Sequence, residues 1–204
     1  MGNRLANNRR LYERIGQGVG RIGVAIGLPP NAWTLIGLAV SVVTAYLFSR
    51  RLLGWALLSM VAIAITDIMD GSTARAGNLA TPFGGVLDHV VDRYEELIVS
   101  AGILFSGLVP PFWVYFGAAG ALMASYVRAK AESMTDIEHC NVGLAGRQEK
   151  TYILLAGIIV QMLGIGVGAL GISIAIVGLV SHITAVQRVI YTYKMVGGRP
   201  RKSD

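Results

Sequence analysis

The sequence predicts an all-α integral membrane protein with six transmembrane helices preceded by an amphipathic helix in the membrane interface. Of its 204 residues, 53% are hydrophobic and only 15% are charged, whereas a soluble domain has about 25% charged residues. The mean hydropathy is +0.56, and the 26 glycines suit closely packed membrane helices. We expect one domain over residues 1–204, made of an interfacial helix (1–28), a six-helix bundle (31–194) and a tail (195–204).

The first segment, residues 4–26, carries apolar residues at spacings of three and four, with arginines on the other faces. This pattern predicts an amphipathic helix lying in the membrane interface. A soluble tail helix is the alternative, and it is less favoured because an apolar span follows at once.

Proline pairs and glycines mark the ends of the predicted spans. Pro29-Pro30 ends the interfacial helix, and Asn31 is placed to cap the first span. Pro110-Pro111 marks the turn between the third and fourth spans. A glycine-rich turn near 164–171 divides a long uncharged stretch into two spans of about 20 residues each. The six predicted spans are 32–49, 52–70, 83–107, 112–131 and the two halves of 151–187.

The distribution of basic residues predicts the orientation of the chain. Six spans place both termini on one side, and all of the eighteen Lys and Arg residues except Arg50 and Arg51 fall on that side. We therefore expect a protein of the cell membrane in which this side faces the cytoplasm. The net charge of +6 fits this bias and an attraction to anionic lipid. Nucleic acid is not an expected partner, because no stripe of interleaved aromatic and basic residues is present.

Two aspartate pairs stand at the cytoplasmic ends of the second and third spans. Asp67 and Asp70 are three residues apart and Asp88 and Asp92 are four apart, so each pair shares one helical face. An ionised carboxylate in or beside hydrocarbon costs at least ~2.5 kcal/mol on insertion scales, which favours a binding role. Four carboxylates converging from two helices predict a site for hard divalent cations, Mg²⁺ or Mn²⁺, with two ions expected.

The same stretch contains a longer pattern: Asp67-x-x-Asp70-Gly71-x-x-Ala74-Arg75, then Gly84-x-x-x-Asp88-x-x-x-Asp92. It resembles the signature of the CDP-alcohol phosphotransferase family at all eight fixed positions. The resemblance extends over nearly the whole chain, since the family has six spans and an interfacial N-terminal helix. It implies transfer of the phospholipid moiety of a CDP-lipid to an alcohol, with release of CMP. The alternative from another class is a cation or lipid transporter, which would more typically place its carboxylates near the bilayer midplane.

The resemblance also implies roles for individual residues. Asp92 is expected to be the general base as well as a metal ligand, because a carboxylate must take the proton of the attacking hydroxyl. Arg75 is a fixed positive charge suited to the pyrophosphate. The small residues Gly71, Ala74 and Gly84 leave room for a cytosine ring or a phosphate. The family also uses an Asn-x-x-Thr motif and a further hydroxyl, which correspond to Asn31, Thr34 and Thr81. Helix capping is an equal alternative role for each of these three residues. The expected CDP-lipid contacts are Asn31, Thr34, Gly71, Ala74, Arg75, Thr81 and Gly84.

For the acceptor, the chain resembles the branch that makes phosphatidylinositol phosphate or its archaeal ether-lipid counterpart. In that branch three basic residues hold the acceptor phosphate, and the matching positions are Arg128, Arg147 and Arg188. Ordinary positive-inside residues are the alternative for the first two. Inositol 1-phosphate is the expected acceptor, with glycerol 3-phosphate as the runner-up.

The lipid substrate is expected to be CDP-diacylglycerol or CDP-archaeol. The family usually forms homodimers, and the small residues Gly117 and Gly120 with their alanine neighbours would permit close helix contact. We interpret His89 and His182 as ordinary polar contacts, and assign Glu95 no catalytic role.

Overall fold

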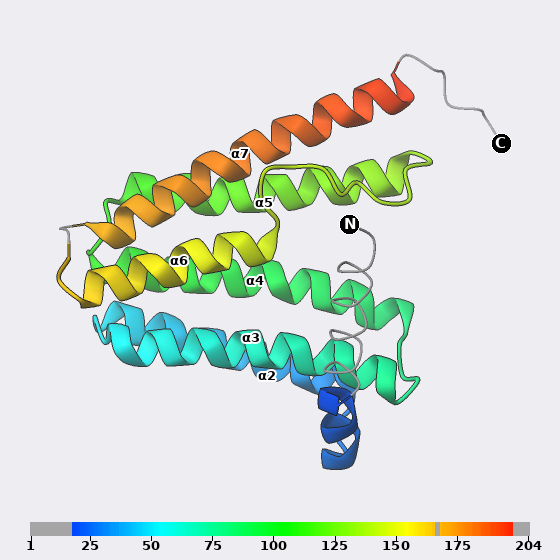
Figure 1. Ribbon diagram of the computed structural model, residues 1–204, viewed down its shortest axis with the longest axis horizontal. Coiled ribbons are helices and arrows are strands. Elements are labelled where there is room, and N and C mark those ends of the chain that lie inside the picture. The colour runs from blue at the N-terminus through cyan, green and yellow to red at the C-terminus, as the bar shows by residue number, and fades with distance from the viewer. Residues whose placement is uncertain (1–17, 166–167, 198–204) are drawn as a thin grey trace, which may run out of the picture. The chain divides into compact units, whose positions relative to one another are not determined.

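The computed structural model describes residues 18–165 and 168–197. Most of the predicted interfacial helix (1–28) and most of the predicted tail (195–204) lie outside the described residues. Within them every regular element is a helix, which confirms the all-α prediction (Figure 1). After a helix over 18–26, the elements are α2 (Pro30–Ser49), α3 (Leu53–Ala76), α4 (Pro82–Ser106), α5 (Pro111–Met134), α6 (Arg147–Met162) and α7 (Ala169–Val196).

These six helices correspond to the six segments that the sequence predicts. By length and composition, three of them are able to cross a membrane among the described residues: α2, α3 and α7. Helix α6 has only 16 residues, and α4 carries the second aspartate pair together with Arg93, Glu95 and Glu96. Six complete spans therefore stay a prediction.

Prolines begin three of the helices, α2, α4 and α5, and two of these starts lie at the predicted breaks Pro29-Pro30 and Pro110-Pro111. Pro30 occupies the first turn of α2 and Pro111 that of α5, where the fixed φ of proline suits a helix and its missing N–H is not needed. The predicted cap by Asn31 is wrong: α2 already begins at Pro30, and no side chain caps it. The turn between α6 and α7 uses Gly164 and Gly168, whose φ angles of 68° and 84° favour glycine.

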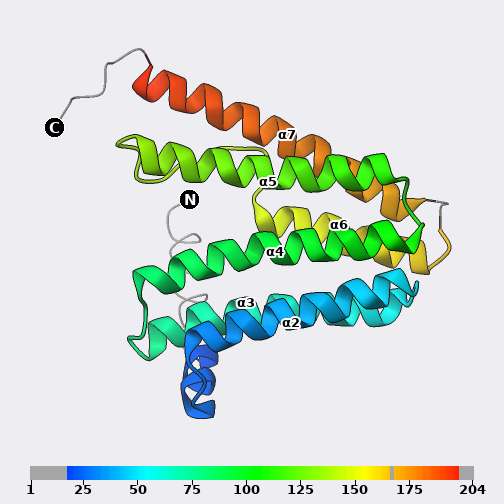
Figure 2. The same ribbon diagram turned by 180° about the vertical axis from the view of Figure 1, so that it is seen from behind.

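The chain divides into two compact units, residues 1–102 and 103–204. In the first unit α2 and α3 pack side by side as an antiparallel pair (Figures 1 and 2). Buried hydroxyls lie between these helices, and the Oγ1 of Thr44 is 2.6 Å from the Oγ of Ser59. In lipid the hydrophobic effect does not drive helices together, so hydrogen bonds between small polar side chains are common at helix contacts.

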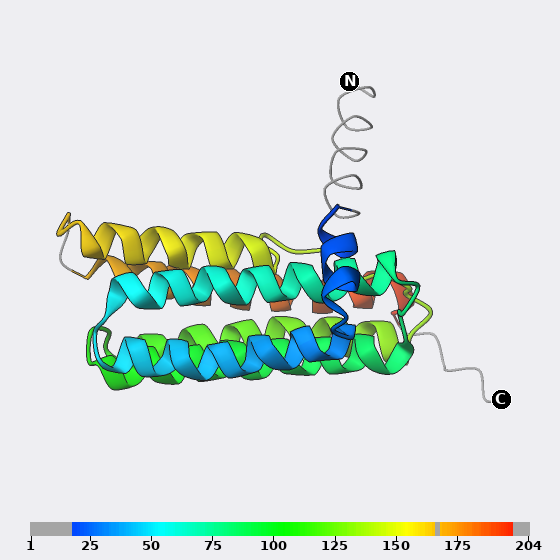
Figure 3. The ribbon, with the colours of Figure 1, turned by 90° about the horizontal axis from the view of Figure 1, so that it is seen from below.

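The helix over 18–26 crosses α3 steeply instead of running along it (Figure 3). Two buried glycines make the contact. A Cβ at Gly20 would collide with the backbone oxygen of Ser72, and one at Gly23 with the hydroxyl of Thr73. The first helix therefore packs directly on the last turns of α3, within one turn of Asp70.

In the second unit α7 packs against both α5 and α6. The contact with α5 depends on glycine: a Cβ at Gly120 would lie 3.0 Å from the carbonyl oxygen of Gly178, and one at Gly178 would lie 3.2 Å from the Cα of Gly117. The expectation that Gly117 and Gly120 serve a contact between protomers needs correction, since both glycines pack inside one chain. The ring of His182 lies 4.5 Å from that of Phe116 at the same crossing.

A glycine on α4 gives a first test of the first unit's packing. A Cβ at Gly102 would collide with the backbone of Ala45 in α2, with the carbonyl oxygen only 2.5 Å away. Gly102→Ala should therefore lower the free energy of unfolding by about 1–3 kcal/mol, the usual cost of overpacking. Gly85→Ala is the matched control on the same helix, because nothing lies within 4 Å of its Cβ position. Thermal unfolding in detergent measures both, and equal midpoints for the two variants would contradict the packing.

Candidate active site

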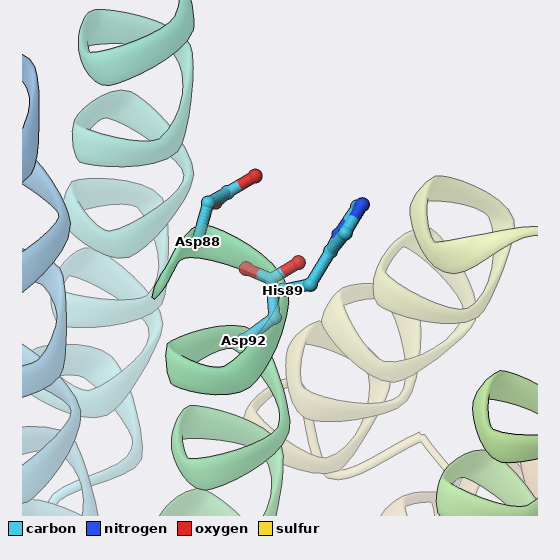
Figure 4. A group of neighbouring side chains, drawn as sticks. All are labelled: Asp88, His89 and Asp92. Carbon is cyan, nitrogen blue, oxygen red and sulfur yellow. The ribbon is translucent and has the colours of Figure 1, made fainter. Parts of the chain in front are cut away.

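The four predicted metal ligands are brought together in the first unit. Asp67 is exposed on α3, whereas Asp70 and Asp92 are only 8% and 7% exposed. Asp88 and Asp67 are both close enough to Asp70 to repel its charge. On α4, one ligand atom each from Asp88, His89 and Asp92 lies within 4.8 Å of the others (Figure 4). The signature therefore folds into one acidic cluster, and His89, which the sequence analysis set aside as an ordinary polar contact, belongs to it.

Asp70 is held in place from two directions. The hydroxyl of Thr34 donates to Oδ2 at 2.9 Å, and the backbone N–H of Gly71 donates to Oδ1 at 2.5 Å. The same hydroxyl lies 3.4 Å from the carbonyl oxygen of Pro30, so Asp70 is the nearer of its two acceptors, and the predicted contact of Thr34 with CDP-lipid stays a prediction. Each carboxylate oxygen has a second lone pair left, so the orientation is fixed while the capacity to bind a cation remains.

Three further predicted contacts meet where α2 and α4 begin. The hydroxyl of Thr81 accepts the N–H of Gly84 at 3.0 Å, which caps α4. A Cβ at Gly84 would lie 3.1 Å from this hydroxyl and 3.2 Å from the Oδ1 of Asn31. The capping alternative therefore holds for Thr81, and Gly84 lets the two polar side chains approach the helix backbone.

Arg75 lies exposed at the end of α3, one turn after Gly71. Its Nη1 would be 3.1 Å from a Cβ at Gly71, and its Nη2 is 3.5 Å from the hydroxyl of Ser72. The guanidinium thus rests against the bare backbone of Gly71, with the half-buried Ala74 beside it in the chain. Because Arg75 is exposed, its guanidinium is accessible to an anionic ligand.

Glu95 is a buried carboxylate for which the sequence analysis found no role. It is 6% exposed, and a Cβ at Gly37 would lie 2.6 Å from its Oε1 and 2.8 Å from the hydroxyl of Thr66. Its spacing of three residues from Asp92 was the available signal, since it puts both side chains on one face of α4. Glu95 thus extends the acidic face of α4 into the packed interior of the first unit.

The arginines predicted to bind the acceptor lie in the second unit. Arg188 donates from Nε to the carbonyl oxygen of Val142 at 2.9 Å and from Nη1 to that of Ala124 at 2.6 Å. Arg128 donates from Nε to Glu132 at 3.0 Å, and it is close enough to Arg188 to repel its charge. Arg147 is the half-buried first residue of α6. The structure thus brings Arg128 and Arg188 together and gives Arg188 two backbone partners that the sequence did not indicate.

Comparison with known proteins gives a consistent result. Residues 28–190 match the CDP-alcohol phosphatidyltransferase family. The archaetidylinositol phosphate synthase of Methanothermobacter thermautotrophicus is 35% identical over 171 residues, which cover 83% of this chain and 85% of that protein. The phosphatidylinositol phosphate synthase of Mycobacterium tuberculosis with CDP-DAG bound superposes with a TM-score of 0.80 at 26% identity, over 94% of this chain and 100% of that one.

The same mycobacterial enzyme in complex with manganese and citrate also has a TM-score of 0.80 and 26% identity, over 92% of this chain and 93% of that one. A family match over most of the chain is what the eight signature positions predicted. It leaves the transporter alternative without support, because the family consists of transferases. The chain therefore belongs to the CDP-alcohol phosphatidyltransferase family.

Proposed function

We propose that this chain is a membrane enzyme that transfers the phosphatidyl or archaetidyl group of a CDP-lipid to inositol 1-phosphate and releases CMP. The observation that carries the proposal is the aspartate signature, which folds into one cluster in a chain of this transferase family. The relatives favour inositol phosphate over glycerol 3-phosphate as acceptor, since the archaeal protein is named an archaetidylinositol phosphate synthase and the mycobacterial protein a phosphatidylinositol phosphate synthase.

The cluster fits a divalent cation by the chemistry of its donors. Carboxylate oxygens are the ligands that Mg²⁺ and Mn²⁺ prefer, and the related structure contains manganese. Asp67, Asp70, Asp88 and Asp92 would hold up to two ions. A bound cation supplies neutralisation of the charge on the pyrophosphate.

The reaction follows from the substrates. The hydroxyl oxygen of the acceptor forms a bond to the lipid-bearing phosphorus, and the bond from that phosphorus to the bridging oxygen breaks. CMP leaves with the bonding electron pair, and Asp92 accepts the proton of the hydroxyl. Thr34 keeps Asp70 in one orientation, and the exposed Arg75 offers N–H donors to the pyrophosphate. Atoms and charges thus balance among the CDP-lipid, the acceptor and Asp92, and the reaction needs no further reactant.

The acceptor phosphate would be bound by Arg128, Arg147 and Arg188. The cluster of basic residues in the termini and connections supports a cytosolic orientation of the active site in the cell membrane. A homodimer remains our expectation from the family resemblance.

An acceptor panel tests the proposed function. Purified protein in detergent, given CDP-lipid and a divalent cation, should release CMP with inositol 1-phosphate at least about tenfold faster than with free inositol or serine, because a charge-assisted contact with phosphate contributes roughly 1.5–3 kcal/mol. Glycerol 3-phosphate tests the runner-up, since it offers a hydroxyl and a phosphate on a smaller polyol. Equal rates with free inositol would refute a phosphorylated acceptor, and no CMP release with any alcohol would refute the transferase.

A further inference from the structure

The α5–α6 loop, residues 135–146, is tied to the second unit at several points. Cys140 is fully buried and packs with Ala131 and Ile137, with Tyr191 against them. The carbonyl of Val142 accepts from Arg188. The centre of the loop is thus held by the buried Cys140 and by the hydrogen bond from Arg188.

Glu132, on the last turn of α5, joins this loop to Arg128. Its Oε1 accepts the backbone N–H of Cys140 at 2.8 Å and the Nε–H of Arg128 at 3.0 Å. Burial alone would raise the pKa of Glu132, but the N–H of Cys140 and the guanidinium of Arg128 lower it below its ordinary value. The side chain is therefore charged at neutral pH and makes both contacts as an anion.

These contacts also determine which donors the arginines have left. A guanidinium has five N–H groups. Arg128 uses its Nε–H on Glu132, and Arg188 uses two N–H groups on the carbonyls of Val142 and Ala124. The Nε–H of each arginine is thus held by a partner within the protein. The remaining Nη donors can bind a phosphate without a change in the orientation of the side chain, as preorganised anion binding requires.

We propose that Glu132 is a positioning residue for the acceptor phosphate: it orients Arg128 directly and fixes the α5–α6 loop, whose carbonyl at Val142 orients Arg188. This inference rests on the proposed function, because it takes the acceptor to be phosphorylated. Charge screening by Glu132 predicts the opposite effect. Glu132 partly cancels the charge of two neighbouring arginines, so its removal alone would raise the local positive potential and tighten phosphate binding. The sign of the change in acceptor KM distinguishes positioning from screening.

Two substitutions separate the contacts of Glu132. Glu132→Ala removes both, and it should raise the KM for inositol 1-phosphate by about tenfold, the loss of roughly one hydrogen bond to a charged group. Glu132→Gln keeps an oxygen that accepts from Cys140 and Arg128 but loses the charge, so a rise of about two- to threefold is expected. The KM for CDP-lipid should stay unchanged in both variants, which a general loss of folding would not produce.

The matched control is Glu138→Gln, which removes the same charge from an exposed position of the same loop. It should leave both KM values at those of the unsubstituted protein. An acceptor KM that is unchanged in Glu132→Ala, or lower in either Glu132 variant, would overturn the positioning role.

Cys140 offers a second readout that does not depend on activity. It is the chain's single cysteine and has no exposed surface, so its labelling by a small maleimide in detergent reports opening of the loop. Labelling should be faster in Glu132→Ala and stay slow in Glu138→Gln. If the acceptor panel fails while Glu132→Ala still speeds labelling, the proposed function is wrong but the loop anchor stands. Unchanged labelling in Glu132→Ala would refute the anchor itself.

Discussion

Asp92→Asn is expected to lose turnover by ~10²–10⁴-fold, because an amide cannot accept the proton of the attacking hydroxyl. Asparagine has nearly the same shape as aspartate and retains one carbonyl oxygen. The largely buried position on α4 should therefore keep its packing. CMP release under saturating CDP-lipid and acceptor measures the effect, and the thermal midpoint in detergent establishes that the variant is folded.

The control is Asp136→Asn, which makes the same chemical change at an exposed residue of the α5–α6 loop. It should release CMP at the rate of the unsubstituted protein. A rate for Asp92→Asn within a few-fold of that value would remove Asp92 from proton transfer. A large loss accompanied by weaker cation activation would instead assign it mainly to the metal site.

Chelation of divalent cations should abolish CMP release, since four neighbouring carboxylates without cations would repel a pyrophosphate. Re-addition of Mg²⁺ or Mn²⁺ should restore activity, because both ions accept oxygen ligands. Asp88→Ala should then raise the cation concentration needed for half-maximal activity. Titration of each ion into the chelated enzyme measures this directly.

His89 provides the comparison within the same cluster. Imidazole is a poorer ligand than carboxylate for Mg²⁺, so His89→Gln should leave activation by Mg²⁺ nearly unchanged although the residue lies beside Asp88 and Asp92. Activity that persists in excess chelator would rule out the divalent-cation mechanism. A His89→Gln variant as impaired in Mg²⁺ activation as Asp88→Ala would add the imidazole to the ligand set.

The sequence predicted those features that depend on residues near one another in the chain. The helix breaks predicted at Pro29-Pro30 and Pro110-Pro111 occur there, because the constraint of proline on φ is local, and Pro30 and Pro111 are the first residues of the helices that follow. The aspartate pairs share helical faces because spacings of three and four residues do so in any α-helix. The cap assigned to Asn31 failed for an equally local reason, since a proline at the first position had already started the helix.

Contacts between distant segments were beyond such reasoning. Thr34 and Asp70 are 36 residues apart, and no spacing rule joins a hydroxyl on one helix to a carboxylate on the next. The two carbonyls that accept from Arg188 lie 46 and 64 residues before it. A backbone carbonyl has the same chemistry in every residue, so a sequence cannot mark it as a partner. Gly117 and Gly120 were recognised as close-contact residues, but their partner proved to be α7 of the same chain.

The glycine contacts of the helix over 18–26 bear on what counts as the smallest functional unit of this protein. The match to the family spans residues 28–190, so a shortened protein designed on that boundary would omit Gly20 and Gly23. The backbone of Ser72 and the side chain of Thr73 would then face lipid or detergent, next to the turn that carries Asp70. The helix over 18–26 would thus count as part of the scaffold that holds Asp70, and a protein cut at residue 28 would lose a packing contact of its active-site helix.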